Sequence, residues 1–480
     1  MGSLILSVED LQVTLGGNPV LRDVSFVIRA KEQWAVFGEA GSGKTVLAYT
    51  LAGHHAYQGR IICEQVDVNG NPALIVVGQQ HRFKDLQNQS QFYYQQRYNS
   101  FDAEATMTLG QDLDLIQPSH SPVLSKKELL NLFQLDLLLE EPLIQLSNGE
   151  NKRLQIVKAV LQSRGLLVLD EPFTGLDKAG RGLLDDMLTV LAEAGQTLML
   201  LSSRDHIPKC FNRFARLEKG SFQSKKNPEE IRIAQSEPRS VRQKHFPAAI
   251  PTDFPAFRYA LRMHQVQVRY GDKQVLEGIN WEVEKGSRWA LTGPNGAGKS
   301  TLLSLITADH PQAYANEIYL FDRRRGSGES IWDIKQKIGF LSPELHLYFD
   351  PAATAFSAIA SGLFDTIGLF RRLNPQQEEK VAEWLDFLDC TDYTHRPLSS
   401  LPLGIQRLIL LARAIIKSPP LLILDEPCQG LDKGQTRDTL KLIDQYCESQ
   451  GAGLIYVSHY QEDFPGCIRH HLKLAAGRIS

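Results

Sequence analysis

The sequence lacks the features that would place it in a membrane or in an oxidising compartment. No apolar run approaches the roughly 18 residues that a membrane-spanning helix needs. The six cysteines are scattered without a C-x-x-C pair, which argues against a disulfide framework, a zinc knuckle or an iron–sulfur cluster. The formal net charge is only −3, so the chain as a whole has no positive excess for nucleic acid or an anionic membrane. We therefore expect a cytoplasmic protein with reduced thiols and no membrane span of its own.

Two glycine-rich segments match the phosphate-loop pattern G-x-x-x-x-G-K-[ST]. Each follows an apolar stretch that predicts a buried strand and precedes a stretch that predicts a helix, which is the context the pattern requires. Glycines allow backbone N–H groups to turn toward a phosphate, and the helix N-terminus adds partial positive charge. The predicted phosphate-binding residues are Gly38, Gly41, Ser42, Gly43, Lys44 and Thr45 in the first loop, and Gly293, Pro294, Asn295, Gly296, Ala297, Gly298, Lys299, Ser300 and Thr301 in the second.

The sequence repeats itself once, and the matching residues keep one constant separation. The matching pairs are Lys44 and Lys299, Leu166–Pro172 and Leu421–Pro427, Gly175–Asp177 and Gly430–Asp432, and Leu146–Glu150 and Leu401–Ile405. Chance does not place four blocks in a single register, so the chain contains one module written twice.

Each copy alternates predicted strands and helices in the same order. The expected elements are strands at Leu11–Leu15, Val24–Ile28, Val266–Tyr270 and Ile279–Val283, helices at Lys152–Ser163 and Arg407–Lys417, and last strands at Leu198–Ser202 and Leu454–Ser458. This alternation predicts an α/β fold with a mostly parallel sheet in each half, and ligands bind at the carboxyl ends of such strands. We expect a first domain at 1–221, a polar, proline-spaced linker at 222–260 and a second domain at 261–480.

An Asp-Glu pair ends an apolar strand in both copies. Two carboxylates after a run of Leu and Val are costly unless they lie at the strand end, facing solvent or a metal. The alternative, a surface salt-bridge pair, is disfavoured by the matching phosphate loop upstream in each copy. The predicted Mg²⁺ ligands are Thr45, Ser300, Asp170 and Asp425, and the residues predicted to position or activate water are Glu171 and Glu426.

With these motifs in place, both copies resemble the nucleotide-binding cassette of ABC-type ATPases. The likeness covers nearly the whole chain outside the linker, and the twin arrangement with Arg323–Asp333 is most similar to the bacterial ModF group, named for its association with molybdate transport. It implies two tandem cassettes that bind and hydrolyse ATP with Mg²⁺, each with a mostly parallel sheet core, an antiparallel β subdomain and a helical subdomain. It also implies that the cassettes pair head to tail, with each ATP between the phosphate loop of one and the signature segment of the other.

The resemblance implies a nearly complete site on Lys299. The residues that it assigns there are Tyr270, which stacks on adenine, Glu426, His459, which contacts the γ-phosphate, and Ser147 and Gly149 from the signature segment of the first copy. One departure concerns the glutamine expected after the next strand, where this sequence offers Pro343 or Glu344.

The site on Lys44 lacks several of these groups. The replacements are Leu15 for the adenine-stacking aromatic, Ser203 or Arg204 for the histidine, with His206 too late in the sequence, and Pro402 for the signature serine. The residues retained are Lys44, Thr45, Gln79, Asp170, Glu171 and, in the incoming signature segment, Gly404. Each hydrogen-bond donor lost to the γ-phosphate removes about 2–4 kcal/mol of transition-state stabilisation. We predict one hydrolytic site, on Lys299, and one site that mainly binds ATP.

The resemblance implies that the ATPase cycle energises a separate membrane permease, as in molybdate-type anion uptake, with the chain peripheral at the inner face of the plasma membrane. The alternative is a soluble ABC ATPase acting in DNA repair, translation or regulation. Ribosome-acting twin cassettes usually carry a longer, strongly charged helical linker, whereas this linker is broken by prolines and mixed in charge. No zinc module or long coiled coil of the DNA-repair kind is visible, so nucleic acid and the ribosome are the less favoured partners.

Two further stretches carry weaker signals. Phe92–Tyr98 mixes aromatic residues with Gln and Arg, as a base-stacking surface would, although a wall against a partner or the protein's own core fits the same composition. Arg323–Arg325 fits either a phosphate contact or the solvated tip of a hairpin, and Trp332 beside it is expected in the core.

Overall fold

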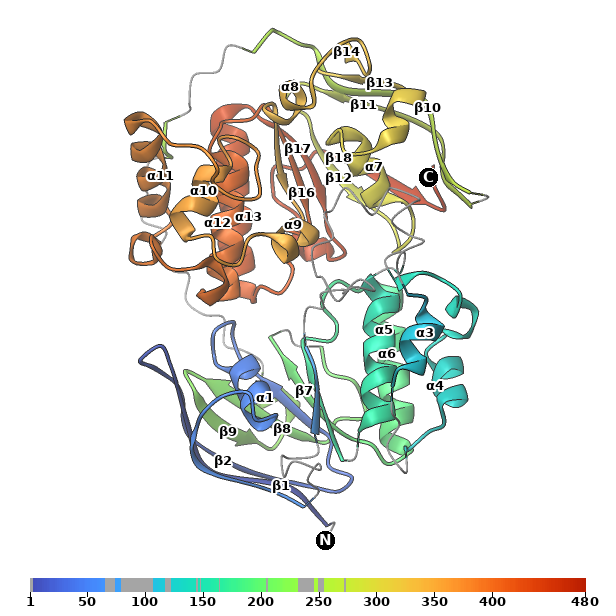
Figure 1. Cartoon of the computed structure of the whole chain (residues 1–480), viewed down its shortest axis with the longest axis vertical. Coiled ribbons are helices and arrows are strands. Elements are labelled where there is room, and N and C mark those ends of the chain that lie inside the picture. The colour runs from blue at the N-terminus through green and yellow to red at the C-terminus, as the bar shows by residue number, and fades with distance from the viewer. Residues whose placement is uncertain are drawn as a thin grey trace. The chain divides into compact units, whose positions relative to one another are not determined.

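The chain folds into two compact units, one built mainly from each copy of the repeat (Figure 1). The computed structural model describes residues 3–64, 74–78, 107–116, 122–143, 146, 148–163, 165–203, 206–231, 246–248, 254–271 and 273–480. Gln79, Ser147, Arg204 and the aromatic stretch Phe92–Tyr98 lie outside these residues. Among the helices that are described, none combines the length and the apolar character needed to cross a membrane.

The first unit contains an antiparallel sheet of order β2-β1-β4 and a six-stranded sheet of order β5-β6-β7-β3-β8-β9. In the larger sheet every described pairing is parallel except that of β9 with β8. The strands are β1 (Leu4–Leu15), β2 (Asn18–Arg29), β3 (Trp34–Phe37), β4 (Gln58–Cys63), β5 (Leu74–Val77), β6 (Leu166–Asp170), β7 (Thr197–Ser202), β8 (Arg213–Glu218) and β9 (Ser221–Lys225). The helices are α1 (Lys44–Leu51), α3 (Leu109–Asp114), α4 (Lys126–Leu132), α5 (Asn148–Gln162), α6 (Lys178–Glu193) and the 3₁₀ turns η2 (Asp136–Leu138) and η4 (Pro228–Ile231).

The second unit repeats this plan, with sheets of order β11-β10-β13-β14 and β15-β16-β17-β12-β18-β19. The strands are β10 (Tyr259–Tyr270), β11 (Lys273–Glu284), β12 (Arg288–Thr292), β13 (Glu317–Leu320), β14 (Arg323–Arg324), β15 (Ile338–Leu341), β16 (Leu421–Asp425), β17 (Gly453–Val457), β18 (His470–Ala475) and β19 (Arg478–Ile479). The helices are α7 (Lys299–Ile306), α8 (Ile331–Lys335), α9 (Pro343–Tyr348), α10 (Ala355–Ser361), α11 (Pro375–Phe387), α12 (Leu403–Ile415) and α13 (Lys433–Gln450), with 3₁₀ turns η5 (Pro311–Ala315), η6 (Thr391–Tyr393), η7 (Leu398–Ser400) and η8 (Gln461–Asp463).

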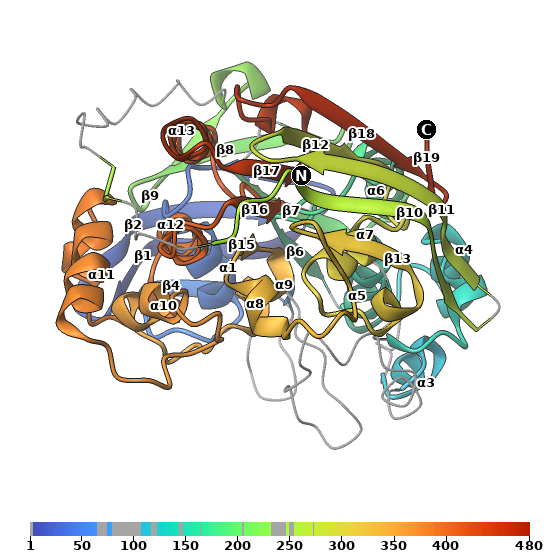
Figure 2. The ribbon, with the colours of Figure 1, turned by 90° about the horizontal axis from the view of Figure 1, so that it is seen from above.

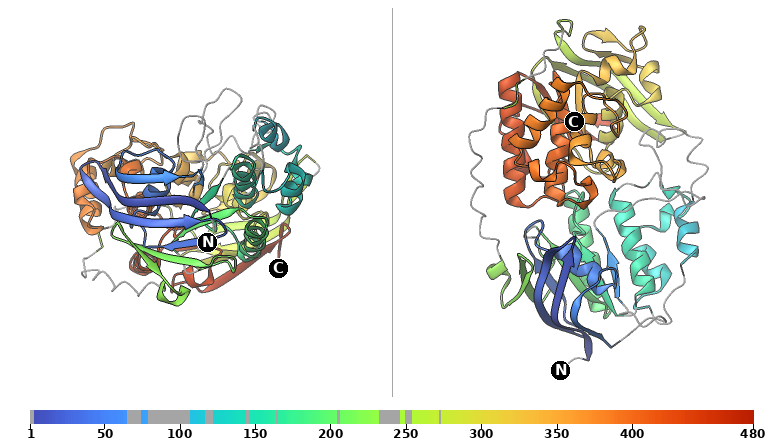
Figure 3. Two further views of the ribbon diagram at one scale, coloured as in Figure 1. Left: turned by 90° about the horizontal axis from the view of Figure 1, so that it is seen from below. Right: turned by 60° about the vertical axis from the view of Figure 1, so that its left-hand side comes forward.

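Each parallel sheet is buried on both faces, which explains why its strands read as continuous apolar runs. Leu167 and Leu169 of β6 join the core under α5 and α6, whereas Leu166 and Val168 join the core under the antiparallel sheet. The second unit shows the same layering: in Figure 1, α10 to α13 lie on one side of β16 and β17, and α7 and β10 lie on the other. Figure 2 shows the long hairpin β10–β11, and Figure 3 shows α3 and α4 beside α5. The predicted α/β fold, with its antiparallel and helical subdomains, is confirmed.

Sequence reasoning missed the last hairpin of each unit. The strands predicted to be last are β7 and β17, but β8–β9 and β18–β19 follow them. Each hairpin turns on two residues with positive φ, namely Lys219 (48°) and Gly220 (82°) in the first unit and Ala476 (47°) and Gly477 (76°) in the second. This combination is typical of a two-residue hairpin turn with a glycine in its second position. β9 pairs with β8 as far as Lys225, so this hairpin continues past residue 221, where we expect the linker to begin.

One described part of the expected linker packs on the second unit. The ring of Phe246 lies 5.3 Å from that of Trp384, 4.9 Å from that of Phe387 and 6.0 Å from that of Tyr446, measured between centroids. Aromatic contacts at this spacing add to the free energy gained by burying the ring. This part of the linker therefore belongs to the core beneath α11 and α13.

We predict that Phe246→Ala lowers the free energy of unfolding of the second unit by about 2 kcal/mol, because a partly buried aromatic cluster loses one ring. Urea unfolding followed by tryptophan fluorescence measures this loss. Phe370→Ala is the matched control, since Phe370 is 80% exposed and its removal should change stability by less than about 0.5 kcal/mol. Equal effects of the two substitutions would contradict the packing of Phe246.

Candidate nucleotide site

Each phosphate loop connects a central strand to a helix and closes on its own lysine. Gly38–Thr45 joins β3 to α1, and Gly293–Thr301 joins β12 to α7. The Lys44 ammonium donates to the carbonyls of the first two loop residues at 2.7 and 3.1 Å, and Lys299 does the same at 2.8 and 3.0 Å. The two loops therefore share one closed geometry, with the ammonium held where phosphate oxygens would be met.

Glycine is required at several points of each loop by its surroundings. Gly43 and Gly298, directly before the helices, have φ of 104° and 97°, which side chains rarely adopt. A Cβ at Gly38 would lie 2.4 Å from a carbonyl oxygen of β8, and one at Gly293 would lie 2.2 Å from a carbonyl oxygen of β18. β8 and β18 thus pack so closely on the phosphate loops that no side chain fits at Gly38 or Gly293.

The late hairpins also bond to the loops, a support that sequence reasoning missed. The N–H of Gly220 donates to the Ser42 carbonyl at 3.2 Å, and the N–H of Gly477 donates to the Ala297 carbonyl at 3.3 Å. A Cβ at either hairpin glycine would lie within 2.4 Å of a backbone oxygen of the neighbouring antiparallel sheet. The Lys-Gly and Ala-Gly dipeptides between short apolar stretches are the signal that could have revealed these hairpins.

The Asp-Glu pair at the end of β6 lies beside the first phosphate loop, as predicted. Thr45 Oγ1 donates to Asp170 Oδ2 at 2.8 Å, and Lys44 Nζ lies 3.7 Å from Glu171 Oε1. Glu171 and its counterpart Glu426 both have a left-handed backbone with φ of 49°. A bulky residue adopts this conformation at a cost, and such strain is concentrated at functional sites. Its recurrence in both units supports a role for the two glutamates.

Burial raises the pKa of both carboxyl groups at the end of β16. For Asp425 burial is the largest cause and the negative charge of Glu344 adds to it, while Lys299 and Arg407 oppose it. For Glu426 burial comes first and the charge of Asp425 second, and together they raise its pKa to about 8. Without a ligand, Glu426 is therefore mostly protonated at neutral pH. Burial also raises the pKa of both carboxyl groups in the first unit.

Among the residues that the structure describes, a histidine faces the glutamate in the second unit only. His459 follows β17 closely, and its Nε2 lies 3.8 Å from Glu426 Oε1. The N–H of Glu171 donates to the carbonyl of Leu201 in β7, and the N–H of Glu426 donates to the carbonyl of Val457 in β17. Leu201 and Val457 therefore occupy equivalent positions, although they are one residue further apart than the spacing of the repeat. This register places Ser203, not Arg204, at the position of His459. His206 is engaged elsewhere, with its Nε2 3.0 Å from a carboxylate of α6.

Several buried oxygens at these sites have no hydrogen-bond partner among the described residues. They are Ser42 Oγ, Asp170 Oδ1 and Glu426 Oε1. Unpaired buried oxygens are costly, and a bound nucleotide with its cation would satisfy them. Asp170 and Thr45 offer the hard oxygen ligands that Mg²⁺ prefers, so the residues present fit this ion.

The expected adenine-stacking residue, Tyr270, is the last residue of β10. Its hydroxyl lies 2.6 Å from His310 Nε2, and its ring is partly buried. Leu15 ends β1 at the equivalent place and is 37% exposed. The second unit thus has an aromatic residue at this position and the first unit has a leucine, as the sequence suggests. The stacking of Tyr270 on adenine stays a prediction.

Pro343 takes the place of the expected glutamine. β15 pairs with β16 as β5 pairs with β6, so the two strands are equivalent. In the sequence, Pro343 is two residues after the end of β15, and Gln79 is two residues after the end of β5. The charge of the adjacent Glu344 acts on Asp425, so a third carboxylate stands near this site.

In the signature segments, Gly149 lies in the first turn of α5. Pro402 directly precedes α12, and the buried Gly404 lies in the first turn of that helix.

Sequence reasoning also missed a buried cation beside each Asp-Glu pair. Lys152 on α5 donates to the carbonyl of Gly78 at 2.8 Å, and its charge acts on Asp170. Arg407 on α12 is only 2% exposed, donates to Gln429 at 3.2 Å and opposes the negative charge around Asp425. Burial lowers the pKa of Lys152 to about 8 and that of Arg407 to about 10. A positive residue at the same place in both copies of this helix was the available signal.

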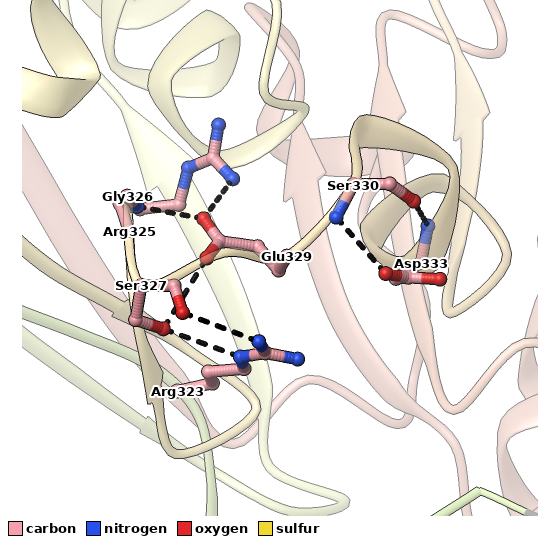
Figure 4. Close-up of polar contacts among 7 residues, drawn as sticks. All are labelled: Arg323, Arg325, Gly326, Ser327, Glu329, Ser330 and Asp333. Carbon is pink, nitrogen blue, oxygen red and sulfur yellow. Dashed lines mark hydrogen bonds and ion pairs between the residues drawn. The ribbon is translucent and has the colours of Figure 1, made fainter.

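The arginine segment forms a turn whose side chains bond to one another (Figure 4). Arg325 is buried, and its Nη1 lies 2.7 Å from Glu329 Oε1. Arg323 and Arg324 are exposed, as a hairpin tip would be. The expectation of a solvated tip is therefore wrong for Arg325, which pairs internally, and the expectation of a core tryptophan is wrong for Trp332, which is 55% exposed.

Together, the twin phosphate loops, Asp-Glu pairs and sheets define an ATP-binding cassette repeated twice. The sequence profile described as ABC transporter matches residues 21–174 and 276–429, and the chain belongs to this family. Its ABC ATPase domains imply an ATP hydrolase.

The chain is similar over its full length to particular twin-cassette proteins. It is 35% identical to the ABC transporter ATP-binding protein ModF of Escherichia coli (strain K12), over 97% of this chain and 96% of that protein. It is 31% identical to the uncharacterised ABC transporter ATP-binding protein C323.04 of Schizosaccharomyces pombe, over 96% of each. The ABCE1-containing structure of ribosome-bound archaeal Pelota and ABCE1 matches with a TM-score of 0.60 and 18% identity, over 98% of this chain and 77% of that chain, which shows the shared fold.

We predict that the nucleotide-free protein loses stability as pH rises from about 5 to about 8. The folded pKa of Glu426 is raised to about 8 from an ordinary value of 4.5, so folding must retain a proton that the unfolded chain releases. Its contribution is full below pH 4.5 and is lost as pH approaches 8, an effect on the order of a few kcal/mol. Urea unfolding at several pH values measures it.

Glu426→Gln should flatten this pH dependence, because glutamine carries no titrating proton. Glu462→Gln, at an exposed position nearby, is the control and should leave the slope as it is. An unchanged slope in Glu426→Gln would show that the carboxyl group is not the source.

Proposed function

We propose that this chain is an ABC-type ATPase in which the site on Lys299 hydrolyses ATP and the site on Lys44 mainly binds it. The observation that carries this proposal is the contrast around the two strained glutamates. Both units keep the phosphate loop, the Asp-Glu pair and the left-handed glutamate, but within the described parts of the chain only Glu426 has a histidine beside it. The serine at that position in the first unit is too short to replace an imidazole in contact with a γ-phosphate.

The second site has groups for each part of the reaction. Lys299, now bonded to loop carbonyls, exchanges them for phosphate oxygens when ATP binds. Asp425 and Ser300 would hold Mg²⁺, which supplies positive charge that neutralises the phosphates. Beside such a charge the raised pKa of Glu426 would fall, and its carboxylate would be able to accept a proton from water. His459 orients the carboxylate and donates to the γ-phosphate.

The remaining part of the proposal concerns the pairing of the cassettes. In the family, two cassettes close head to tail on ATP, and Ser147 with Gly149 would then complete the site on Lys299. Pro402 offers no hydroxyl to the site on Lys44, whereas Gly404 still allows close approach of the helix N-terminus. This supports the same division between a hydrolytic and a mainly binding site.

We propose further that the cycle energises a separate membrane permease, in anion uptake of the molybdate kind. The support is the similarity to ModF over the full length of both proteins, together with the family to which the chain belongs. The site residues themselves carry no information on the transported substrate, because function beyond ATP hydrolysis depends on the partner. Action on the ribosome or on DNA is the alternative outcome of the experiment below.

We predict that Glu426→Gln lowers kcat for ATP hydrolysis by at least about 100-fold, since a general base contributes on that order. The matched variant Glu171→Gln should lower kcat by less than about threefold. Steady-state phosphate release at saturating ATP measures both. Loss of turnover in Glu171→Gln with turnover kept in Glu426→Gln would reverse the assignment of the two sites.

We predict that affinity-tagged protein isolated from detergent-solubilised membranes of its own host carries a multi-span membrane protein. ATP-trapped Glu426→Gln should retain more of it than the wild type, because hydrolysis no longer reopens the complex. Mass spectrometry identifies the partner, and an unrelated tagged cytosolic protein controls for background. Recovery of ribosomes or DNA in place of a multi-span protein would contradict the transport proposal.

A further inference from the structure

β11 pairs with one edge of β10 as far as Tyr270, but the last part of the opposite edge is held by side chains. On its outer edge, β13 pairs with β10 only from Leu261 to His264. Beyond that point, Asn316 exchanges two hydrogen bonds with the backbone of Gln267, at 2.8 and 2.9 Å. Gln312 does the same with the backbone of Arg269, at 3.1 and 2.7 Å. Each amide group thus imitates a residue of a missing strand, because it offers one donor and one acceptor.

His310 extends this series by one step, to Tyr270. Its Nδ1 accepts from the N–H of Gln312 at 3.1 Å, so in the neutral ring the proton lies on Nε2. Nε2–H therefore donates to the Tyr270 hydroxyl at 2.6 Å. Burial lowers the pKa of His310 to about 4, in agreement with a neutral ring at physiological pH. His310 is only 2% exposed, so its position is set by the surrounding core.

The first unit is built differently at the same place. There β4 pairs directly with β1 as far as Gln12, so no amide side chains are needed. Ile61 pairs with Val8 as Ile318 pairs with Met263, so Gly59 stands at the position of Asn316. His55 holds the place of His310 in the repeat, and Leu15 that of Tyr270. The side-chain arrangement and the tyrosine thus occur together in one copy and are both missing from the other, among the described residues.

We propose that His310, Gln312 and Asn316 form a clamp that positions the ring of Tyr270 for a purine base. The clamp makes these three positioning residues for nucleotide binding at the site on Lys299, and the inference rests on the proposed role of Tyr270 there. An aromatic ring held in place before binding loses less conformational freedom when the base stacks on it. The clamp would therefore lower the KM for ATP and leave the chemical step unchanged.

Four variants test the clamp through the KM for ATP hydrolysis. His310→Leu should raise KM about fivefold with kcat within about twofold, the effect expected for one lost hydrogen bond. His310→Gln should stay near the wild-type KM, because glutamine can accept from the Gln312 N–H and donate to the tyrosine. Tyr270→Phe should match His310→Leu, and the double variant should be no worse than either single one. His55→Ala is the matched control in the first unit and should leave KM unchanged.

Three outcomes would overturn the clamp. The first is a KM in His310→Gln as high as in His310→Leu, and the second is additive effects in the double variant. The third is a fall in kcat and melting temperature without a change in KM, which would mean a structural role alone.

Tyr270→Leu separates this inference from the proposed role of Tyr270. If Tyr270→Leu raises KM and His310→Leu does not, only the clamp fails. If Tyr270→Leu itself leaves KM unchanged, the adenine-stacking role fails, and the clamp fails with it.

Discussion

Two carboxylates at the end of a strand that is buried on both faces are the constraint on which each unit depends. Their charges lie at the edge of two apolar cores, where ionisation is unfavourable without nearby cations. The phosphate-loop lysine supplies one cation, and Lys152 or Arg407 from the helix after the signature segment supplies the other. Both cations are themselves held by backbone or amide oxygens. The phosphate loop and the start of the helix after the signature segment therefore both supply positive charge to the carboxylates at the strand end.

The raised pKa of Glu426 connects this requirement to catalysis. A carboxyl group that holds its proton cannot act as a base, so under the proposed mechanism Glu426 would gain that ability only with a cation beside it. Under the same proposal, the site without ATP would not activate water. The strained backbone at the same residue stays in place because the strands on both sides determine it.

Duplication has kept the parts that bind phosphate and changed the parts around them. The strained glutamates, the supporting hairpins and most of the loop glycines have closely similar φ angles in the two copies, and their hydrogen bonds match. The differences concern the histidine after β17, the tyrosine at the end of β10 and the edge that holds it. Because all three changes bear on one site, they support a division of labour between two ATP sites that share an ancestral design.

The sequence alone determined the twin cassettes, the phosphate loops, the Asp-Glu pairs and the α/β fold, because these depend on local patterns of glycine, charge and apolar residues. It could not determine the last hairpins, whose glycines matter through contacts with distant strands, or the buried Lys152 and Arg407, whose partners lie on other elements. It left Ser203 and Arg204 open, since only the pairing of β6 with β7 reveals the one-residue offset. It likewise could not show that His310 faces Tyr270, because that contact joins a turn to a strand end forty residues away and exists only once the sheet is formed.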